Sequence, residues 1–277
     1  MFGDSVAASL TALAAHRAHG TVAVVASLVT APVAVLASQL RVLRGAAAED
    51  PGLVGAHLEG PFLAPERKGA HDAAHLAHPT PSMVEDLLAA GDGVLRQVTI
   101  APELPGALEA ISRMTSAGVV AAVGHTAAGA SLAREAFDAG ARLVTHAFNA
   151  MPGIAGRDAG PVGAAIADER VAIEVIADGI HVDPALIGLL FREAPGRVVL
   201  VSDAMAAAGS EDGRYVLGGL DVDVHDGRAV IAGTDTLAGS TLSLDRAVEV
   251  VVAAGVERDA AVAAASTVPA RVLGLRL

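Results

Sequence analysis

Seven short runs of apolar, mostly β-branched residues recur along the chain, and their spacing constrains the fold more than any other feature. They are residues 21–29, 53–57, 97–101, 119–125, 143–146, 171–177 and 198–203. Helical sequence lies between them. The Asp183-Pro184 pair, for example, is typical of the first residues of a helix. Runs that are apolar on both faces and alternate with helices are typical of a parallel sheet covered by helices. The sequence therefore predicts an α/β fold.

The polar residues that end these runs favour a closed barrel over an open doubly wound sheet. Chemistry gathers at the carboxyl ends of the strands in a parallel barrel. The candidate groups at these ends are His57 with Glu59, His125, His146, Asp178 with His181, and Asp203. An open sheet would concentrate its site at one topological switch, and no G-x-G-x-x-G or Walker sequence supports a nucleotide there. We therefore expect a TIM-type barrel.

One segment, at about residues 213–233, breaks the alternation of strand and helix. Apolar and polar positions alternate in it, with turn signals at Gly218-Gly219 and Asp226-Gly227, which predicts a β-hairpin excursion. Two helices are predicted after it, over 240–254 and 259–275. No linker rich in Pro, Gly or Ser divides the chain, so we expect residues 1–277 to form a single catalytic domain.

Composition excludes several classes of function. Acidic residues outnumber basic residues by 31 to 19, and the net charge of −12 argues against a nucleic-acid partner. No apolar stretch reaches the ~18 residues that a membrane span needs, and no secretion signal is recognisable. Cysteine is absent, so a metal must use His, Asp or Glu. These features predict a cytoplasmic protein with no membrane partner.

One glutamate and two histidines follow the pattern of a catalytic metal site. Glu59 follows an apolar strand and precedes a Gly-Pro turn, while His125 and His146 end two later strands. Taken singly, they are explained as a surface carboxylate and two hydrogen-bonded core histidines. Together, at one mouth of a barrel, they supply the three protein ligands of an open catalytic site. We predict one divalent ion per chain, zinc first, with iron, cobalt or manganese as alternatives.

Three further residues are candidates for chemistry at the same mouth. Asp203 ends the last run, where it either caps a helix or accepts a proton from water and returns it to a leaving amine. His71 follows the Glu59 turn in the same loop, and His181 follows the run at 171–177. The structural alternative for both histidines is a solvated position in a loop.

These residues belong to an ordered set of motifs. The set comprises HLEGPF at 57–62, KGAH at 68–71, GHT at 124–126, THAFNAM at 145–151, DGIHV at 178–182, SDAM at 202–205 and TLAGS at 236–240. It spans most of the chain and resembles the N-acetylglucosamine-6-phosphate deacetylase family of the amidohydrolase superfamily. The resemblance implies a (β/α)8 barrel with a small β domain. It also implies hydrolysis of the acetamide of N-acetylglucosamine 6-phosphate to glucosamine 6-phosphate and acetate, in amino-sugar catabolism.

The resemblance assigns roles to the catalytic residues by motif. Glu59, His125 and His146 would hold the metal. Asp203 would be the general acid/base, and His71 would donate a hydrogen bond to the acetyl carbonyl of the substrate.

The resemblance also implies how substrate is bound. His181 would contact the sugar and its phosphate end, and Asn149, Ala150 and Arg157 would bind the phosphate. A guanidinium suits phosphate because its forked donors match two oxygens. Family members are often dimers, so a homodimer is expected.

The sequence departs from the family pattern at its start. Family members begin with strands of the β domain and then a barrel strand carrying His-x-His, and neither is found here. We therefore expect a barrel of seven strands, lacking the first strand and most of the small β domain, with a single metal. One alternative is another amidohydrolase acting on a cyclic amide or a base, which the absence of His-x-His and of a strand-terminal lysine disfavours. The other is a truncated, weakly active or non-catalytic sugar-phosphate-binding remnant.

Overall fold

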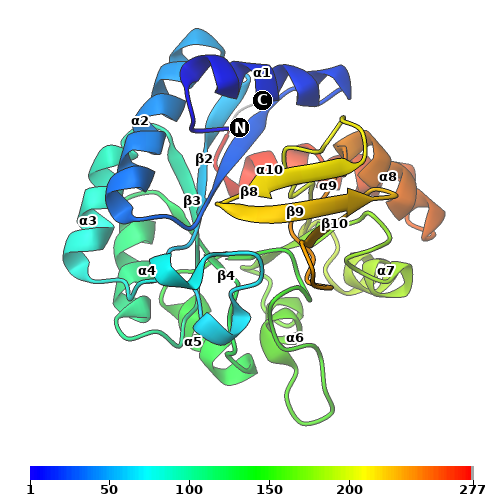
Figure 1. Cartoon of the computed structure of the whole chain (residues 1–277). Coiled ribbons are helices and arrows are strands. Elements are labelled where there is room, and N and C mark those ends of the chain that lie inside the picture. Colours follow the sequence, from blue (N-terminus) through cyan, green and yellow to red (C-terminus); the bar gives the residue numbers. More distant parts are fainter. Residues whose placement is uncertain (276–277) are drawn as a thin grey trace.

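A curled sheet of seven parallel strands forms the centre of the molecule (Figure 1), as a computed structural model of the chain describes it over residues 1–275. The strands pair in sequence order from β1 to β7. They are β1 (Val24–Val29), β2 (Leu53–Glu59), β3 (Leu95–Ile100), β4 (Val120–Val123), β5 (Leu143–Val144), β6 (Ala172–Ile176) and β7 (Val198–Val201). Each apolar run contributes one strand, so the predicted seven-stranded α/β barrel class is confirmed.

Helices cover the outer face of this sheet (Figure 1). They are α1 (Val6–Ala18), α2 (Val33–Glu49), α3 (Pro81–Ala90), α4 (Ala107–Ser116), α5 (Ala130–Asp138), α6 (Gly160–Ile166), α7 (Pro184–Glu193), α8 (Leu244–Ala253), α9 (Arg258–Ala264) and α10 (Thr267–Val272). Asp183 caps α7 as its sequence predicts, because its side chain accepts a hydrogen bond from the Ala185 amide. All five residues of β6 are buried, as expected for a strand covered on both faces.

The two ends of the pairing order, β1 and β7, are not paired with each other within residues 1–275. A cavity of about 480 Å³ lies between them, lined by Val24, Val201, Val248 and other residues. The sheet is therefore curled like a barrel but open along one seam. Its register still brings the carboxyl ends of neighbouring strands together, with Val29 opposite Glu59 and Glu59 opposite Thr99.

A second, antiparallel sheet lies beyond β7. It consists of β8 (Gly213–Leu217), β9 (Leu220–His225) and β10 (Arg228–Ile231). The predicted hairpin thus has a third strand, because the chain pairs again after the turn at Asp226, whose φ is 49°. Met205, Ala207 and Val222 belong to its own small apolar core. The turn at Gly218 and Gly219 lines the cleft described below.

The last predicted helix is divided into α9 and α10. The break follows from Pro269, which has no amide hydrogen and whose ring would clash with the carbonyl four residues earlier in a continuous helix. Helix α10 instead restarts at Thr267, so that Pro269 lies in its first turn. None of the helices within residues 1–275 combines the length and apolarity needed to cross a bilayer.

Candidate metal centre

The catalytic candidates lie where the chain leaves the strands, and the backbone there is strained. Non-glycine residues rarely adopt positive φ, yet His125, His146 and Asp203 have φ of 47°, 25° and 49°. Such outliers persist where the surrounding structure fixes them, and they cluster at functional sites. Gly60, directly after Glu59, has φ of 92°, and a Cβ there would lie 2.2 Å from Thr30 Oγ1. The turn after Glu59 therefore requires glycine.

Glu59, His125 and His146 converge on one point at this mouth. Glu59 Oε1 lies 3.0 Å from His125 Nε2 and 2.8 Å from His146 Nε2, and the two Nε2 atoms are 3.0 Å apart. Ligands of a tetrahedral ion, bound at about 2.0–2.2 Å, lie about 3.3–3.6 Å from one another. The observed separations would need to expand by about 0.3–0.8 Å to reach these values, and all three side chains are buried. This donor set fits a divalent cation.

Hydrogen bonds leave the lone pair of His125 facing that point. His125 Nδ1 lies 2.8 Å from the carbonyl oxygen of Arg67, and a carbonyl can only accept, so Nδ1 carries the hydrogen. Nε2 of a neutral ring is then free to bind an ion. His146 Nδ1 is buried without a hydrogen-bond partner among residues 1–275.

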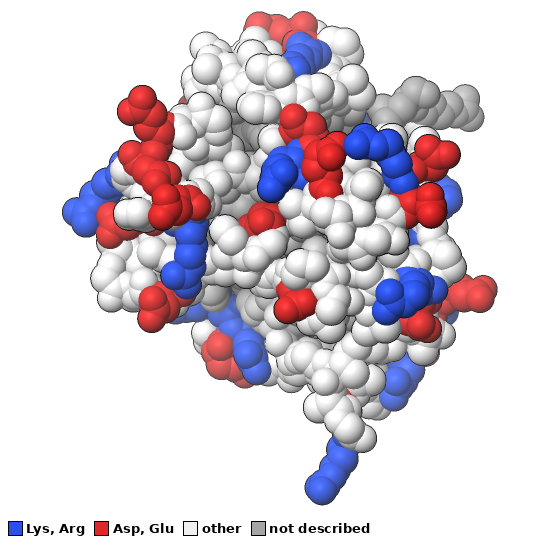
Figure 2. Space-filling model, turned by 90° about the vertical axis from the view of Figure 1, so that its right-hand side faces the viewer, with Lys and Arg blue, Asp and Glu red and all other residues white. Residues whose placement is uncertain are grey.

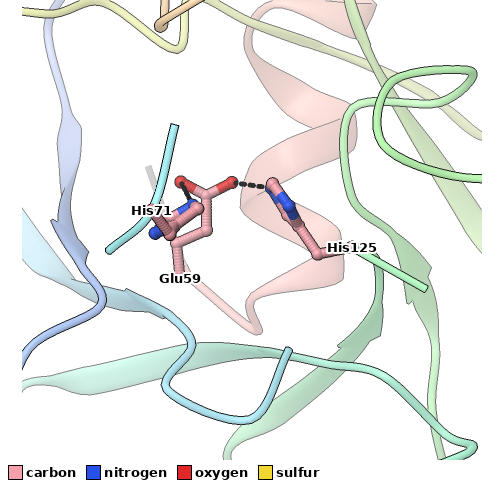
Figure 3. Close-up of side chains that lie close together, drawn as sticks. All are labelled: Glu59, His71 and His125. Carbon is pink, nitrogen blue, oxygen red and sulfur yellow. Dashed lines mark hydrogen bonds and ion pairs between the residues drawn. The ribbon is translucent and has the colours of Figure 1, made fainter. Parts of the chain in front are cut away.

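His71 lies beside Glu59 and His125 (Figure 3). Its hydrogen bonding indicates a different tautomer from that of His125. The amide of Thr30 donates to His71 Nδ1 at 3.3 Å, which leaves the hydrogen of a neutral ring on Nε2. Burial lowers the pKa of His71 to about 4, which favours that neutral ring. Nε2 lies 3.6 Å from Glu59 Oε2, and one ligand atom each of Glu59, His71 and His125 lie within 4.8 Å of one another. His71 is therefore arranged to donate a hydrogen bond into the site.

The pKa values of two carboxyl groups in the site are shifted in opposite directions. Burial raises the pKa of Asp203, and the nearby Glu59 carboxylate raises it further. Burial also acts to raise the pKa of Glu59, but the adjacent imidazoles of His125 and His146 outweigh burial and hold that pKa well below its usual value. Glu59 is thus kept as an anion for a cation to bind. Asp203 is the carboxyl group better placed to take up and release a proton.

His181 is held by Asp178 at the edge of the same cleft. The imidazole Nδ1 lies 2.6 Å from Asp178 Oδ2, and Asp178 Oδ1 accepts the backbone amides of Ile180 and His181 at 2.8 Å each. Asp178 therefore orients the ring and leaves Nε2 of His181 for a ligand.

A belt of hydrogen bonds joins polar side chains of β1, β2 and β3 to Thr145, which follows β5. His57 Nδ1 lies 2.9 Å from Ser27 Oγ and His57 Nε2 lies 2.8 Å from Thr99 Oγ1, which in turn contacts Thr145 Oγ1 at 2.7 Å. Both ring nitrogens of His57 are thus occupied, so His57 is a structural residue here and not a ligand. Sequence reasoning missed the belt, although polar side chains within apolar strands were its signal.

The proposed metal ligands and most of the proposed substrate residues line one cleft of about 760 Å³. These lining residues are Glu59, His71, His125, His146, Asn149, Ala150, His181 and Asp203. The side-chain amide of Asn149 donates to the carbonyls of His146 and Ala147 at 3.2 Å each, which shapes the turn after the ligand. Arg157 is not among the lining residues. It is exposed, in a tight turn next to α6 that extends from the molecule (Figure 1).

Comparisons with known proteins show the family to which the chain belongs. Residues 3–277 match the amidohydrolase family. N-acetylgalactosamine-6-phosphate deacetylase of Escherichia coli O157:H7 is 41% identical over 271 residues, which cover 96% of this chain and 72% of the relative. N-acetylglucosamine-6-phosphate deacetylase of Bos taurus is 39% identical, over 95% of this chain and 68% of the relative.

Solved structures show the same similarity in three dimensions. A variant of N-acetyl-D-glucosamine-6-phosphate deacetylase from Mycobacterium smegmatis, in complex with N-acetyl-D-glucosamine 6-phosphate, superposes with a TM-score of 0.93 at 47% identity, covering 95% of this chain and 71% of that one. The N-acetylglucosamine-6-phosphate deacetylase from Pasteurella multocida gives 0.94 at 28% identity, covering 99% and 73%. The chain belongs to the amidohydrolase family, and within it the similarity is to the amino-sugar-phosphate deacetylases.

Proposed function

We propose that this protein hydrolyses the acetamide of N-acetylglucosamine 6-phosphate to glucosamine 6-phosphate and acetate, as a cytoplasmic enzyme of amino-sugar catabolism. The observation that carries the proposal is the convergence of Glu59 Oε1 with the Nε2 atoms of His125 and His146 within 3.0 Å, beside Asp203 in one cleft. The names of the similar proteins support the choice of substrate.

Glu59, His125 and His146 are proposed to hold one divalent ion per chain, zinc first. When bound, such an ion polarises the amide carbonyl and lowers the pKa of the attacking water. The anionic carboxylate of Glu59 and the lone pair that the Arg67 carbonyl leaves on His125 Nε2 suit this role. Three protein ligands leave a coordination position open, as catalytic sites require.

Asp203 is proposed to move the proton in both halves of the reaction. Water adds to the acetyl carbon while Asp203 takes its proton. The carbon–nitrogen bond then breaks, and Asp203 returns the proton to the departing amine nitrogen. The raised pKa of Asp203 suits a group that must hold the proton between these steps. The Nε2 hydrogen of His71 donates to the acetyl oxygen as negative charge develops there.

The sugar phosphate is proposed to bind to His181, Asn149, Ala150 and Arg157. His181 and the turn at Asn149 and Ala150 line the cleft of their own chain. Because Arg157 lies outside that cleft, we propose that the protein is a homodimer in which Arg157 reaches the neighbouring subunit's cleft. Acidic and basic side chains are interspersed on the face in Figure 2, which gives no continuous basic surface there for nucleic acid.

An acetate-release assay on the zinc-loaded protein tests the proposal. We expect turnover of N-acetylglucosamine 6-phosphate, with loss of activity after chelation and recovery when zinc returns. The galactosamine epimer is assayed in parallel, because one similar protein is named for it. Binding of glucosamine 6-phosphate without acetate release from either substrate would contradict the proposed enzymatic activity. It would instead favour a protein that binds sugar phosphates without hydrolysing them.

A further inference from the structure

Carboxyl groups outnumber cationic side chains in the cleft, although the proposed substrate carries a phosphate. Its lining includes five carboxyl groups, those of Asp4, Glu59, Glu66, Asp203 and Asp235. An ion held by Glu59 would offset part of this charge, yet a phosphate elsewhere in the cleft would still meet carboxylates. Among the described residues that line it, Arg67 is the one arginine, and none is a lysine.

Arg67 is fixed in the cleft through its backbone. It ends the short 3-10 helix η1 (Pro65–Arg67), its amide donates to the Ala64 carbonyl at 2.9 Å, and its carbonyl accepts from His125 Nδ1 at 2.8 Å. The amide of Ala64 in turn donates to the His125 carbonyl at 2.9 Å. The Arg67 side chain therefore starts from a defined position beside a metal ligand.

Arg67 is half-buried, and its guanidinium has no hydrogen-bond or ion-pair partner within residues 1–275. Some arginines elsewhere are occupied: Arg17 pairs with Asp50, and Arg170 pairs with Asp168 at 2.6 Å. The neighbouring Lys68 is also occupied, because its Nζ donates to the carbonyls of Gly69 and His71 at 3.4 and 3.2 Å. Arg67 thus keeps its forked donors for a ligand.

We propose that Arg67 binds the 6-phosphate of the substrate from within the same chain, and that it determines the preference for phosphorylated sugars. A guanidinium recognises phosphate through two parallel charge-assisted hydrogen bonds. This assignment rests on the proposed function and adds a phosphate ligand that needs no second subunit. Arg157, exposed outside the cleft, acts only if a neighbouring chain presents it.

Steady-state kinetics of zinc-loaded variants test the assignment. Arg67→Gln removes the charge while its backbone still accepts from His125, so metal content should stay at the wild-type level. We expect KM for N-acetylglucosamine 6-phosphate to rise about ten- to a hundred-fold with kcat little changed, because one charge-assisted pair is lost. Arg67→Lys should recover part of the loss. The kcat/KM for unphosphorylated N-acetylglucosamine should equal that of the wild type.

The controls separate the assignment from its alternatives. Arg41→Gln, on the exposed face of α2, should leave KM unchanged. An unchanged KM in Arg67→Gln, or an equal loss on both sugars, overturns the assignment while leaving the deacetylase intact. A loss confined to Arg157→Gln also overturns it and points to the second subunit.

Calorimetric titration with glucosamine 6-phosphate keeps the test independent of turnover. If the wild type binds this product but releases no acetate, weaker binding by Arg67→Gln supports the assignment although the proposed function has failed. If the wild type neither binds the product nor hydrolyses the substrate, both proposals are rejected.

Discussion

Within residues 1–275, two clusters of carboxylates and histidines could each gather ligand atoms around an ion, and they differ in burial and in how their side chains are held. Ligand atoms of Glu59, His71 and His125 lie within 4.8 Å of one another, and with His146 and Asp203 of the same cleft these residues form the buried cluster. Asp212, His225 and Asp226, whose ligand atoms also lie within 4.8 Å, form the exposed cluster. The first is buried at the mouth of the parallel sheet. The second is exposed at a turn of the small sheet, where the His225 and Asp226 side chains are 88% and 91% accessible.

The difference shows that proximity alone does not make a site. At the buried cluster, the Arg67 carbonyl and the Thr30 amide fix the tautomers of His125 and His71. At the exposed cluster, the Asp212 carboxylate instead accepts the Asp226 amide at 2.5 Å and so stabilises a turn. Water also screens exposed charges and lowers their attraction for an ion. Orientation and exclusion of water distinguish the two clusters.

Removal of a proposed ligand from the buried cluster should have the largest effect. His146→Ala leaves Glu59 and His125 with one donor too few for a three-ligand site. We expect metal content to fall to background and acetate release to become undetectable. Elemental analysis after dialysis measures the metal content, and the acetate-release assay measures the activity. A variant that retains a full complement of metal would remove His146 from the ligand set.

Asp203→Asn separates chemistry from metal binding within the buried cluster. The amide occupies nearly the same volume but cannot carry a proton between water and amine. We expect a loss of about 10²–10⁴-fold in kcat, typical of removing a general acid/base, with metal content unchanged. Wild-type kcat in this variant would refute the role of Asp203.

The sequence could anticipate the buried cluster because strand order alone carries residues to it. Glu59, His125 and His146 end three strands whose carboxyl ends meet at one edge, so recognition of the strands was enough. The strands were recognisable because each is a short, mostly apolar run that alternates with helical sequence. The position of His71 beside Glu59 followed from the motif, and not from any periodicity.

The contacts that orient the site histidines could not be predicted from the sequence, because they depend on the paths of loops. Thr30 and the Arg67 carbonyl contact His71 and His125 from segments 41 and 58 residues away along the chain. No local pattern encodes such pairs. Arg157, which the motif predicts to bind phosphate, lies on an exposed turn, whereas Arg67, to which no motif gave a role, lines the cleft. Positive φ at four site residues, His125, His146, Ala150 and Asp203, could not be predicted either, because non-glycine residues rarely adopt it.

His71 lies as close to Glu59 and His125 as an ion ligand would, but its tautomer makes it a hydrogen-bond donor. For His71→Ala we expect unchanged metal content and a fall of about 10²–10³-fold in kcat, the usual effect of losing one donor to a developing oxyanion. Metal analysis and kinetics on the same preparation measure both, and thermal unfolding checks the fold. Loss of the metal would make His71 a ligand instead.

The exposed cluster should show the smallest effect of all. We expect the double variant Asp212→Ala, His225→Ala to keep the wild-type metal content and kcat, because solvent already competes for every ligand atom in that turn. The same variant should lose some stability of the small sheet, since Asp212 no longer accepts the amides of Asp226 and Gly227. Hydrogen exchange at the turn between β9 and β10 measures this local change. If zinc binding fell by one ion per chain, exposure would not be the property that separates the two clusters, and the turn would be a second metal site.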